Sequence, residues 1–302
     1  MELVLRRLID LARDVSQGRY DRADELFELT APGSCPPLLS ELAEAFGMMV
    51  VQVEGREFRL QNLISDLERV NAELKASLDK VELLEQVRGH LNKFVPRSVA
   101  KLIADSPDAP DLAKRQRDVS VLFLDIAGYT RLSQQVETAQ MDRIVHTYFS
   151  AFLDAIYANH GDVNETAGDG LMILFQQDDP LEHSLAAART ALAIAQRARE
   201  MGPSLEVDGQ KLRLHQGINS GPALVGSSCY QGLSGDRWTY TATGPTTNLA
   251  ARVAGLALGG QVLVGPETAR RLAGHYQMKS LGPQFMKNIE QPVEVFELID
   301  AD

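Results

Sequence analysis

Two aspartates, Asp125 and Asp169, stand where carboxylates can gather metal ions and phosphates. Asp125 follows an apolar run, Val119 to Leu124, that is typical of a strand buried on both faces. A turn and an amphipathic segment come next, so free N–H groups of a helix start would lie beside it. Asp169 lies between two glycines and two short apolar strands, which predicts a tight hairpin with this carboxylate at its tip. If both aspartates meet at one sheet edge, they form the oxygen-rich site that a magnesium pair handling a triphosphate requires.

Each aspartate also has a simpler interpretation. A single Asp before a helix is more typical of an N-cap. Gly-Asp-Gly is a common turn sequence that needs no functional explanation. The functional interpretation therefore depends on residues elsewhere in the chain.

A compact domain that begins near Arg115 must position these residues. The hydrophobic periodicity predicts strands over 118–125, 162–166, 171–176, 211–219, 237–242, 261–264 and 293–298, and helices over 130–159, 181–200 and 246–256. Helices mixed with hairpin-connected strands favour an α+β sheet domain with its helices on one side.

The chain before this domain has helical patterns. Residues 3–15 carry a narrow apolar stripe, a loop-like connector runs to Pro37, and helical spacing resumes at Leu39. From Leu60 to Val81 a heptad repeat predicts a coiled coil, with Asn71 on the seam, where a buried Asn favours a parallel dimer. The alternative is a solvated Asn on a helix that packs within its own chain.

Three spaced segments resemble the class III nucleotidyl cyclases: FLDIAGYT, ETAGDGLMILF and YTATGPTTNLAAR, within a similarity that spans 118–298. The resemblance implies a ferredoxin-like mixed sheet with helices packed on it. It also implies a catalytic domain that works as a head-to-tail homodimer with shared active sites, converting ATP or GTP to a 3′,5′-cyclic nucleotide and pyrophosphate. Two Mg²⁺ ions per site, or Mn²⁺ in their place, are the implied cofactors.

The resemblance assigns roles to particular residues. Asp125 and Asp169, with the backbone of Ile126, match the metal site, and Asn248 and Arg252 match the pair that orients the ribose and stabilises charge on the α-phosphate. Lys287 matches the lysine that reaches the terminal phosphates. The loop that holds the triphosphate is matched by Ala127, Gly128, Tyr129 and Thr130. Asn248 and Arg252 are one helical turn apart, so a helix would present both to one ligand.

Glu165 and Thr241 match the positions that select the purine. A carboxylate accepts hydrogen bonds from guanine N1–H and its exocyclic amine but would face the lone pair of adenine N1. Glu165 therefore favours GTP, although Thr241 suits either base and an adenylate cyclase stays open. Two features depart from the family pattern, Pro245-Thr246 before the asparagine and a long loop over 227–236, and either could weaken activity.

The first part of the chain resembles a HAMP module, on the segment from Ser40 to Met49. The expected organisation is a HAMP-like module over 1–58, a coiled coil and linker over 59–112, and the cyclase domain over 113–302. An unrelated helical hairpin that dimerises is the alternative for the first of these.

Composition limits the remaining choices. The chain has 302 residues and a formal net charge of −11, which argues against nucleic-acid binding. Its two cysteines lie far apart, and neither a signal peptide nor a membrane segment is evident, so a soluble cytoplasmic protein is expected. The rival functions are a nucleotide-sensing pseudo-cyclase without catalysis and a dimeric signalling adaptor.

Overall fold

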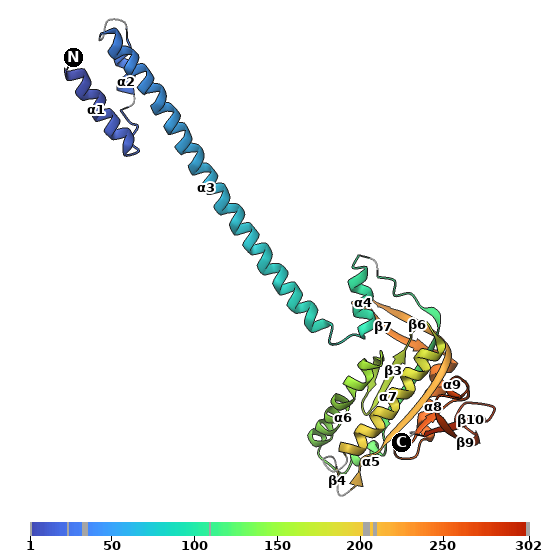
Figure 1. Cartoon of the computed structure of the whole chain (residues 1–302). Coiled ribbons are helices and arrows are strands. Elements are labelled where there is room, and N and C mark those ends of the chain that lie inside the picture. The colour runs from blue at the N-terminus through green and yellow to red at the C-terminus, as the bar shows by residue number, and fades with distance from the viewer. Residues whose placement is uncertain are drawn as a thin grey trace. The chain divides into compact units, whose positions relative to one another are not determined.

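A computed structural model describes residues 2–22, 24–31, 36–108, 110–201, 206–207 and 210–299. The chain divides into two compact units, Met1–Arg88 and Gly89–Asp302. Figure 1 shows the helical elements of the first unit and the sheet of the second.

The first unit is a small helical assembly. It contains α1 (Glu2–Ser16), α2 (Asp24–Leu29) and most of α3 (Pro37–Leu91). Its core holds six buried apolar residues, Leu8, Leu11, Leu26, Leu29, Ala43 and Val50. The short helix α2 occupies part of the connector that was expected to be a loop, because Leu26 and Leu29 bury their side chains between the longer helices.

The second unit is built on one mixed sheet. Its strands follow the order β2-β3-β1-β6-β8-β10-β9, and β7 pairs with β6 off this path. The strands are β1 (Arg115–Ile126), β2 (Asp162–Ala167), β3 (Gly170–Phe175), β6 (Leu214–Gly232), β7 (Gly235–Thr243), β8 (Val262–Val264), β9 (Gln277–Gln284) and β10 (Val293–Ile299). Two short strands, β4 (Glu206–Val207) and β5 (Gln210–Lys211), pair with each other outside this sheet. The α+β prediction is confirmed.

Helices cover both faces of the sheet, so the prediction of helices on one side was wrong. The main core joins the sheet to α5 (Tyr129–Leu132), α6 (Thr138–Ala158), α7 (Pro180–Met201) and α9 (Pro266–Leu272). On the opposite face, Val119 and Val121 of β1 pack with Ala250 of α8 (Pro245–Leu256). Gly217 permits this layer, since a Cβ there would lie 2.1 Å from the Ala254 nitrogen.

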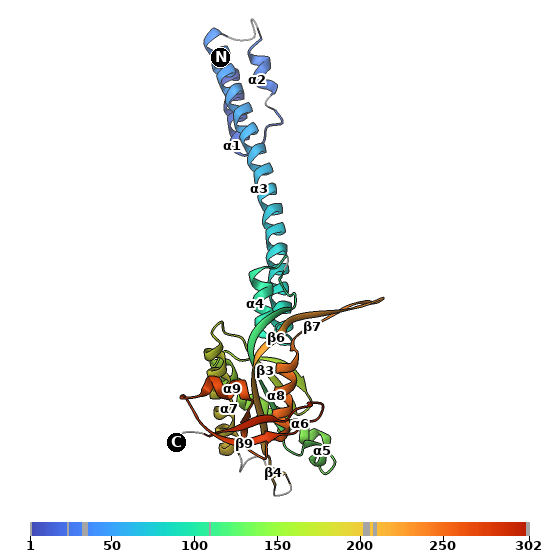
Figure 2. The same ribbon diagram turned by 90° about the vertical axis from the view of Figure 1, so that its right-hand side faces the viewer.

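Several elements differ from the predicted ones. Helix α4 (Arg97–Asp105) was missed, because prolines at 96, 107 and 110 suggested a linker, whereas Pro96 precedes the helix and the other two follow it. The helix expected over 130–159 is interrupted between α5 and α6. The long loop expected over 227–236 is instead the end of a β6–β7 hairpin that projects from the sheet (Figure 2). Across the described ranges, no helix is both long and apolar enough to cross a bilayer.

Candidate active site

Asp125 and Asp169 are brought together by strand pairing. Asp125 is the second-last residue of β1 and pairs with Gly170, the residue after Asp169. Strands β2 and β3 form a hairpin through Gly168 and Asp169, and Gly168 has a φ of 59°. A positive φ at the first central residue is what a type II′ hairpin turn requires, and glycine adopts it without strain. The predicted hairpin with Asp169 at its tip is confirmed.

The two carboxyl groups interact strongly. Burial, together with a hydrogen bond and charge repulsion from Asp169, raises the pKa of Asp125 to about 7. A hydrogen bond from the Ile126 backbone acts in the opposite direction and is a smaller effect. Both aspartates are half-buried, so solvent compensates only part of the repulsion. Such a pair is unfavourable when both groups are ionised, unless a cation lies between them.

The donor set fits a divalent cation that takes further ligands from its substrate. Two aspartate carboxylates at one sheet edge supply hard oxygen ligands, which Mg²⁺ and Mn²⁺ prefer. Among the described residues, no cluster of three or more His, Cys, Asp or Glu side chains could hold a metal. Mg²⁺ sites built from one or two carboxylates plus substrate phosphates are common, so two carboxylates suffice here.

The segment expected to hold a triphosphate lies directly after Asp125. The amide of Ala127 donates to the Arg213 carbonyl at 2.8 Å, so this amide is not free to bind phosphate. Gly128 adopts a φ of 73°, and α5 begins at Tyr129. Amides in the first turn of a helix have no intrahelical acceptor, which leaves Tyr129 and Thr130 as the candidates for anion contacts.

The two expected purine contacts, Glu165 and Thr241, touch one another. The Thr241 hydroxyl donates to Glu165 Oε1 at 2.7 Å, and the side chain of the adjacent Asn164 donates to the Tyr240 carbonyl at 2.9 Å. These contacts hold β2 beside β7. Glu165 also lines a hollow of about 910 Å³ whose walls include Phe94 and Trp238. Sequence spacing could not have joined positions 165 and 241, because the contact depends on how β7 folds back along β6.

Asn248 and Arg252 lie on α8, and no hydrogen bond or ion pair joins them to Asp125 among the described residues. Both are exposed on α8, whose first turn is anchored at Pro222 by a hydrogen bond of 2.6 Å from Thr246 Oγ1 to the Pro222 carbonyl. Asp125 pairs with His215 of β6, seven positions from Pro222. At roughly 3.3 Å per residue, the first turn of α8 lies ~23 Å along β6 from Asp125. The helix then runs back along β6, and Ala254 in its last turn lies against Gly217, two positions from His215.

Lys287 also lies apart from Asp125. It is exposed in the segment between β9 and β10, and β10 is the third strand from β1 in the sheet. The described contacts therefore join Asp125 to Asp169 and Glu165 to Thr241, and none of them joins Asn248, Arg252 or Lys287 to these pairs.

Comparison with known families identifies the second unit of the chain. The model of the adenylate and guanylate cyclase catalytic domain matches residues 112–299. The chain belongs to this family. Its fold also resembles solved cyclase structures, among them the adenylyl cyclase CyaB from P. aeruginosa, at 23% identity and a TM-score of 0.58. That match covers 63% of this chain and 98% of CyaB.

Other cyclases are similar as well. The guanylate cyclase domain of RhGC from Catenaria anguillulae, solved with GTP, is 20% identical, with a TM-score of 0.53, over 62% of this chain and all of that domain. Adenylate cyclase 1 of Rhizobium meliloti is 24% identical over 210 residues, which are 68% of this chain and 31% of that relative. The chain thus spans about a third of the length of this curated relative.

One neighbour of Asp125 was not predicted from the sequence. His215 lies directly across from Asp125 in the β1–β6 ladder, and burial lowers the pKa of its imidazole. Its position on a long apolar strand gave no signal, because the β1–β6 register fixes this contact and sequence periodicity does not reveal register.

Proposed function

We propose that this chain is a purine nucleotidyl cyclase that forms a 3′,5′-cyclic nucleotide and pyrophosphate. The observation that carries the proposal is the Asp125–Asp169 pair, two facing carboxylates whose repulsion raises the pKa of Asp125 to about 7. A structural cap or turn has no need of two such groups at one sheet edge. A site that receives a cation with its nucleotide does need them.

Asp125 and Asp169 are the proposed ligands of Mg²⁺ or Mn²⁺, with two ions in the complete site. Bound cations would lower the pKa of the ribose 3′-hydroxyl and offset the charge of the pyrophosphate leaving group. The amides at the start of α5 would bind the triphosphate. Arg252 would stabilise the charge that develops on the α-phosphate, and Asn248 would orient the ribose, because guanidinium and amide groups donate to these oxygens.

Glu165 favours GTP as the substrate. In the structure the Thr241 hydroxyl donates to one oxygen of Glu165, which leaves the other oxygen to accept from the guanine edge. An adenine would instead bring its N1 lone pair toward that carboxylate. ATP stays the alternative substrate, since Thr241 can also accept a hydrogen bond from the adenine amine.

A second copy of the chain would complete the site. Asn248 lies in the first turn of α8, which is ~23 Å along β6 from Asp125 at the rise of a strand, so Asn248 of one chain suits a site on its partner. Arg252, one helical turn later on the same exposed side of α8, would act with it. Lys287 would be supplied in the same way. The β6–β7 hairpin supports such a contact, because Tyr230, Leu233 and Trp238 expose 62%, 111% and 59% of their surface.

The amino-terminal helices would hold together two copies of the second unit, Gly89–Asp302, which is called the catalytic unit below. The seam residues of the heptad expose between 54% and 61% of their surface in a single chain: Leu60, Ile64, Leu67, Leu74, Leu78 and Val81. A long helix with such a regular apolar seam is stable when it pairs. The proposed arrangement is a HAMP-like module followed by a parallel coiled coil, through which a signal reaches the cyclase.

Product identification tests the proposal. The 302-residue chain is incubated with ATP and with GTP, first with Mg²⁺ and then with Mn²⁺, and the products are separated by chromatography. The proposal expects cyclic nucleotide and pyrophosphate in equal amounts, more from GTP than from ATP, and none from Asp169→Ala. Nucleotide binding without product from the wild-type chain would favour a pseudo-cyclase, and neither binding nor product would favour a signalling adaptor.

A further inference from the structure

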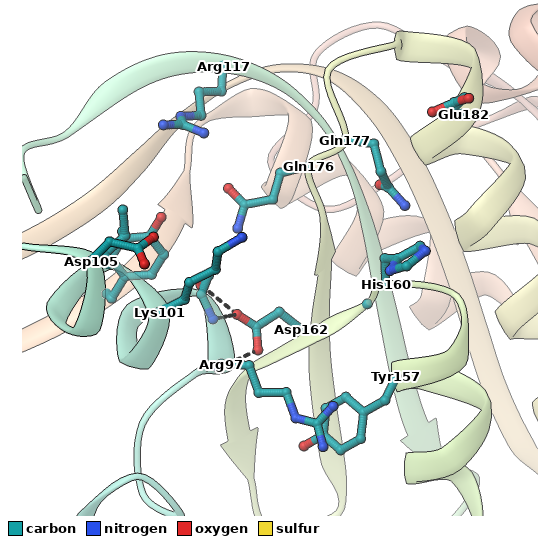
Figure 3. A pocket seen from close by; sticks show the side chains of 14 residues that line it. Arg97, Lys101, Asp105, Arg117, Tyr157, His160, Asp162, Gln176, Gln177 and Glu182 are labelled. Carbon is teal, nitrogen blue, oxygen red and sulfur yellow. Dashed lines mark hydrogen bonds between the residues drawn. The ribbon is translucent and has the colours of Figure 1, made fainter.

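A second hollow of the catalytic unit does not include Asp125 or Asp169. Its volume is about 780 Å³, within the range of small-molecule sites. Helix α4 forms one wall, and the ends of α6, β2 and β3, together with β1 and β7, form the others. Figure 3 shows the side chains that line it.

The α4 wall of this hollow is firmly held. The Asp162 carboxylate accepts hydrogen bonds from the amides of Arg97 and Ser98, at 2.8 and 2.9 Å, and from the Ser98 hydroxyl. The Arg97 guanidinium lies 3.4 Å from the centre of the Tyr157 ring. Asp162 thus caps the helix, and its charge is compensated by the amides and the dipole of the helix start.

Three donors line the same hollow. Lys101 lies one helical turn after Arg97, and its side chain points toward Gln176 in Figure 3, while Arg117 of β1 lines the hollow as well. In the described part of the chain, no carboxylate lies within ion-pair distance of Lys101 or Arg117. A lysine, an arginine and an amide group that share one space form a typical anion site.

The acidic residues of the hollow do not cancel this positive end. Glu182 lies at the opposite end, on the side of His160 and Gln177 (Figure 3). Asp105 is one turn further along α4 than Lys101 and is not paired with it. Gln177 donates to the Asn159 carbonyl, and its own buried Oε1 has no hydrogen-bond partner among the described residues. An unpaired buried acceptor would suit a ligand with an N–H or O–H group at that end.

We infer that this hollow binds a small molecule that carries a phosphate or carboxylate group. Lys101 and Arg117 are its anion contacts, and Gln176 donates a further hydrogen bond. The volume exceeds what an inorganic ion needs, so the ligand has a polar body that extends toward Gln177. The inference does not depend on the cyclase proposal, because no proposed catalytic residue lines the hollow.

Calorimetric titration of the 302-residue chain tests this inference. Inorganic phosphate, pyrophosphate and citrate serve as probes, with EDTA present and in the Asp169→Ala background, so that neither metal nor the metal site contributes to binding. We expect saturable binding of at least one probe. Phosphate or pyrophosphate binding alone would identify a phosphate ligand, and citrate binding alone would identify a carboxylate ligand.

Substitutions then assign the site. Lys101→Gln combined with Arg117→Gln is expected to weaken binding at least about tenfold, the loss expected from removing charge-assisted hydrogen bonds. Both side chains are exposed, so unchanged thermal unfolding is expected for this variant. Lys101→Arg should retain binding, and Lys279→Gln, an exposed lysine on β9, is the matched control. Binding of no probe, or equal binding by wild type and the double variant, would overturn the inference.

Discussion

The Asp125–Asp169 pair predicts that the metal-free enzyme is more stable when one carboxylate is removed. The pKa of Asp125 rises from its ordinary 3.8 to about 7 in the folded chain. Between these values the folded chain holds a proton that the unfolded chain has released, so stability falls as pH rises through this window. The full penalty is present above pH 7. Asp125→Asn removes it, because the amide carries no charge.

The magnitude follows from the shift in pKa. About three pH units at 1.36 kcal/mol each give an upper bound of ~4 kcal/mol. Because Asp125 is only half-buried, solvent screening reduces this to about 1–2 kcal/mol. For a unit of about 200 residues, each kcal/mol raises the unfolding temperature by about 2–4 °C. Asp125→Asn should therefore unfold about 2–8 °C above wild type at pH 8 in EDTA.

Thermal unfolding followed by the fluorescence of Trp238 provides the assay. Trp238 is the only tryptophan of the chain and lies on β7, so it reports on the catalytic unit. The difference should shrink at pH 5. It should reverse when Mg²⁺ and GTP are added, since only wild type keeps both proposed metal ligands. Asp142→Asn, at an exposed position of α6, is the control and should change little. An Asp125→Asn variant no more stable than wild type at pH 8 would refute the reasoning.

Three further predictions concern other parts of the chain. The double variant Leu67→Glu, Leu74→Glu on the coiled-coil seam should lower activity, and the loss should be greatest at low protein concentration. The control Ala76→Glu, off the seam, should not lower it. If the activity of the double variant depended on protein concentration just as that of wild type does, the dimeric coiled coil would be contradicted. Burial lowers the pKa of His183, so the stability that its neutral form contributes is present above pH 6.5 and is lost as pH falls below it. Urea unfolding between pH 5 and 7.5 should show this loss in wild type and less of it in His183→Gln. Glu165→Lys should shift turnover from GTP toward ATP by about tenfold or more, and an unchanged GTP-to-ATP ratio would show that Glu165 does not select the base.

The elements that the sequence predicts well are those with a strong local pattern. The apolar run before Asp125 became the central strand β1, and the Gly-Asp-Gly segment became the β2–β3 hairpin. Helix α9 and strand β9 were missed, because each is short and only partly apolar. The prolines around α4 suggested a linker, although they only mark where this helix begins and ends.

Long-range contacts could not be predicted from one sequence. Two hydrogen bonds follow from strand register, which is a property of the assembled sheet. One joins the Thr241 hydroxyl to Glu165, and the other joins the Ala127 amide to the Arg213 carbonyl. Helix α8 can pack against β6 only because Gly217 has no side chain. Family resemblance supplied the candidate residues at the site, and the structure shows which of them are in contact, Asp125 with Asp169 and Glu165 with Thr241.

A mixing experiment with two inactive variants tests the shared active site most directly. Asp169→Ala and Arg252→Ala are each expected to be inactive, since each removes a group from both sites of a symmetric dimer. Co-expressed chains form mixed dimers in which one of the two sites is intact, so cyclic nucleotide formation should recover to about a quarter of the wild-type rate under random pairing. A mixture no more active than either variant alone would contradict a site completed by a second copy of the chain.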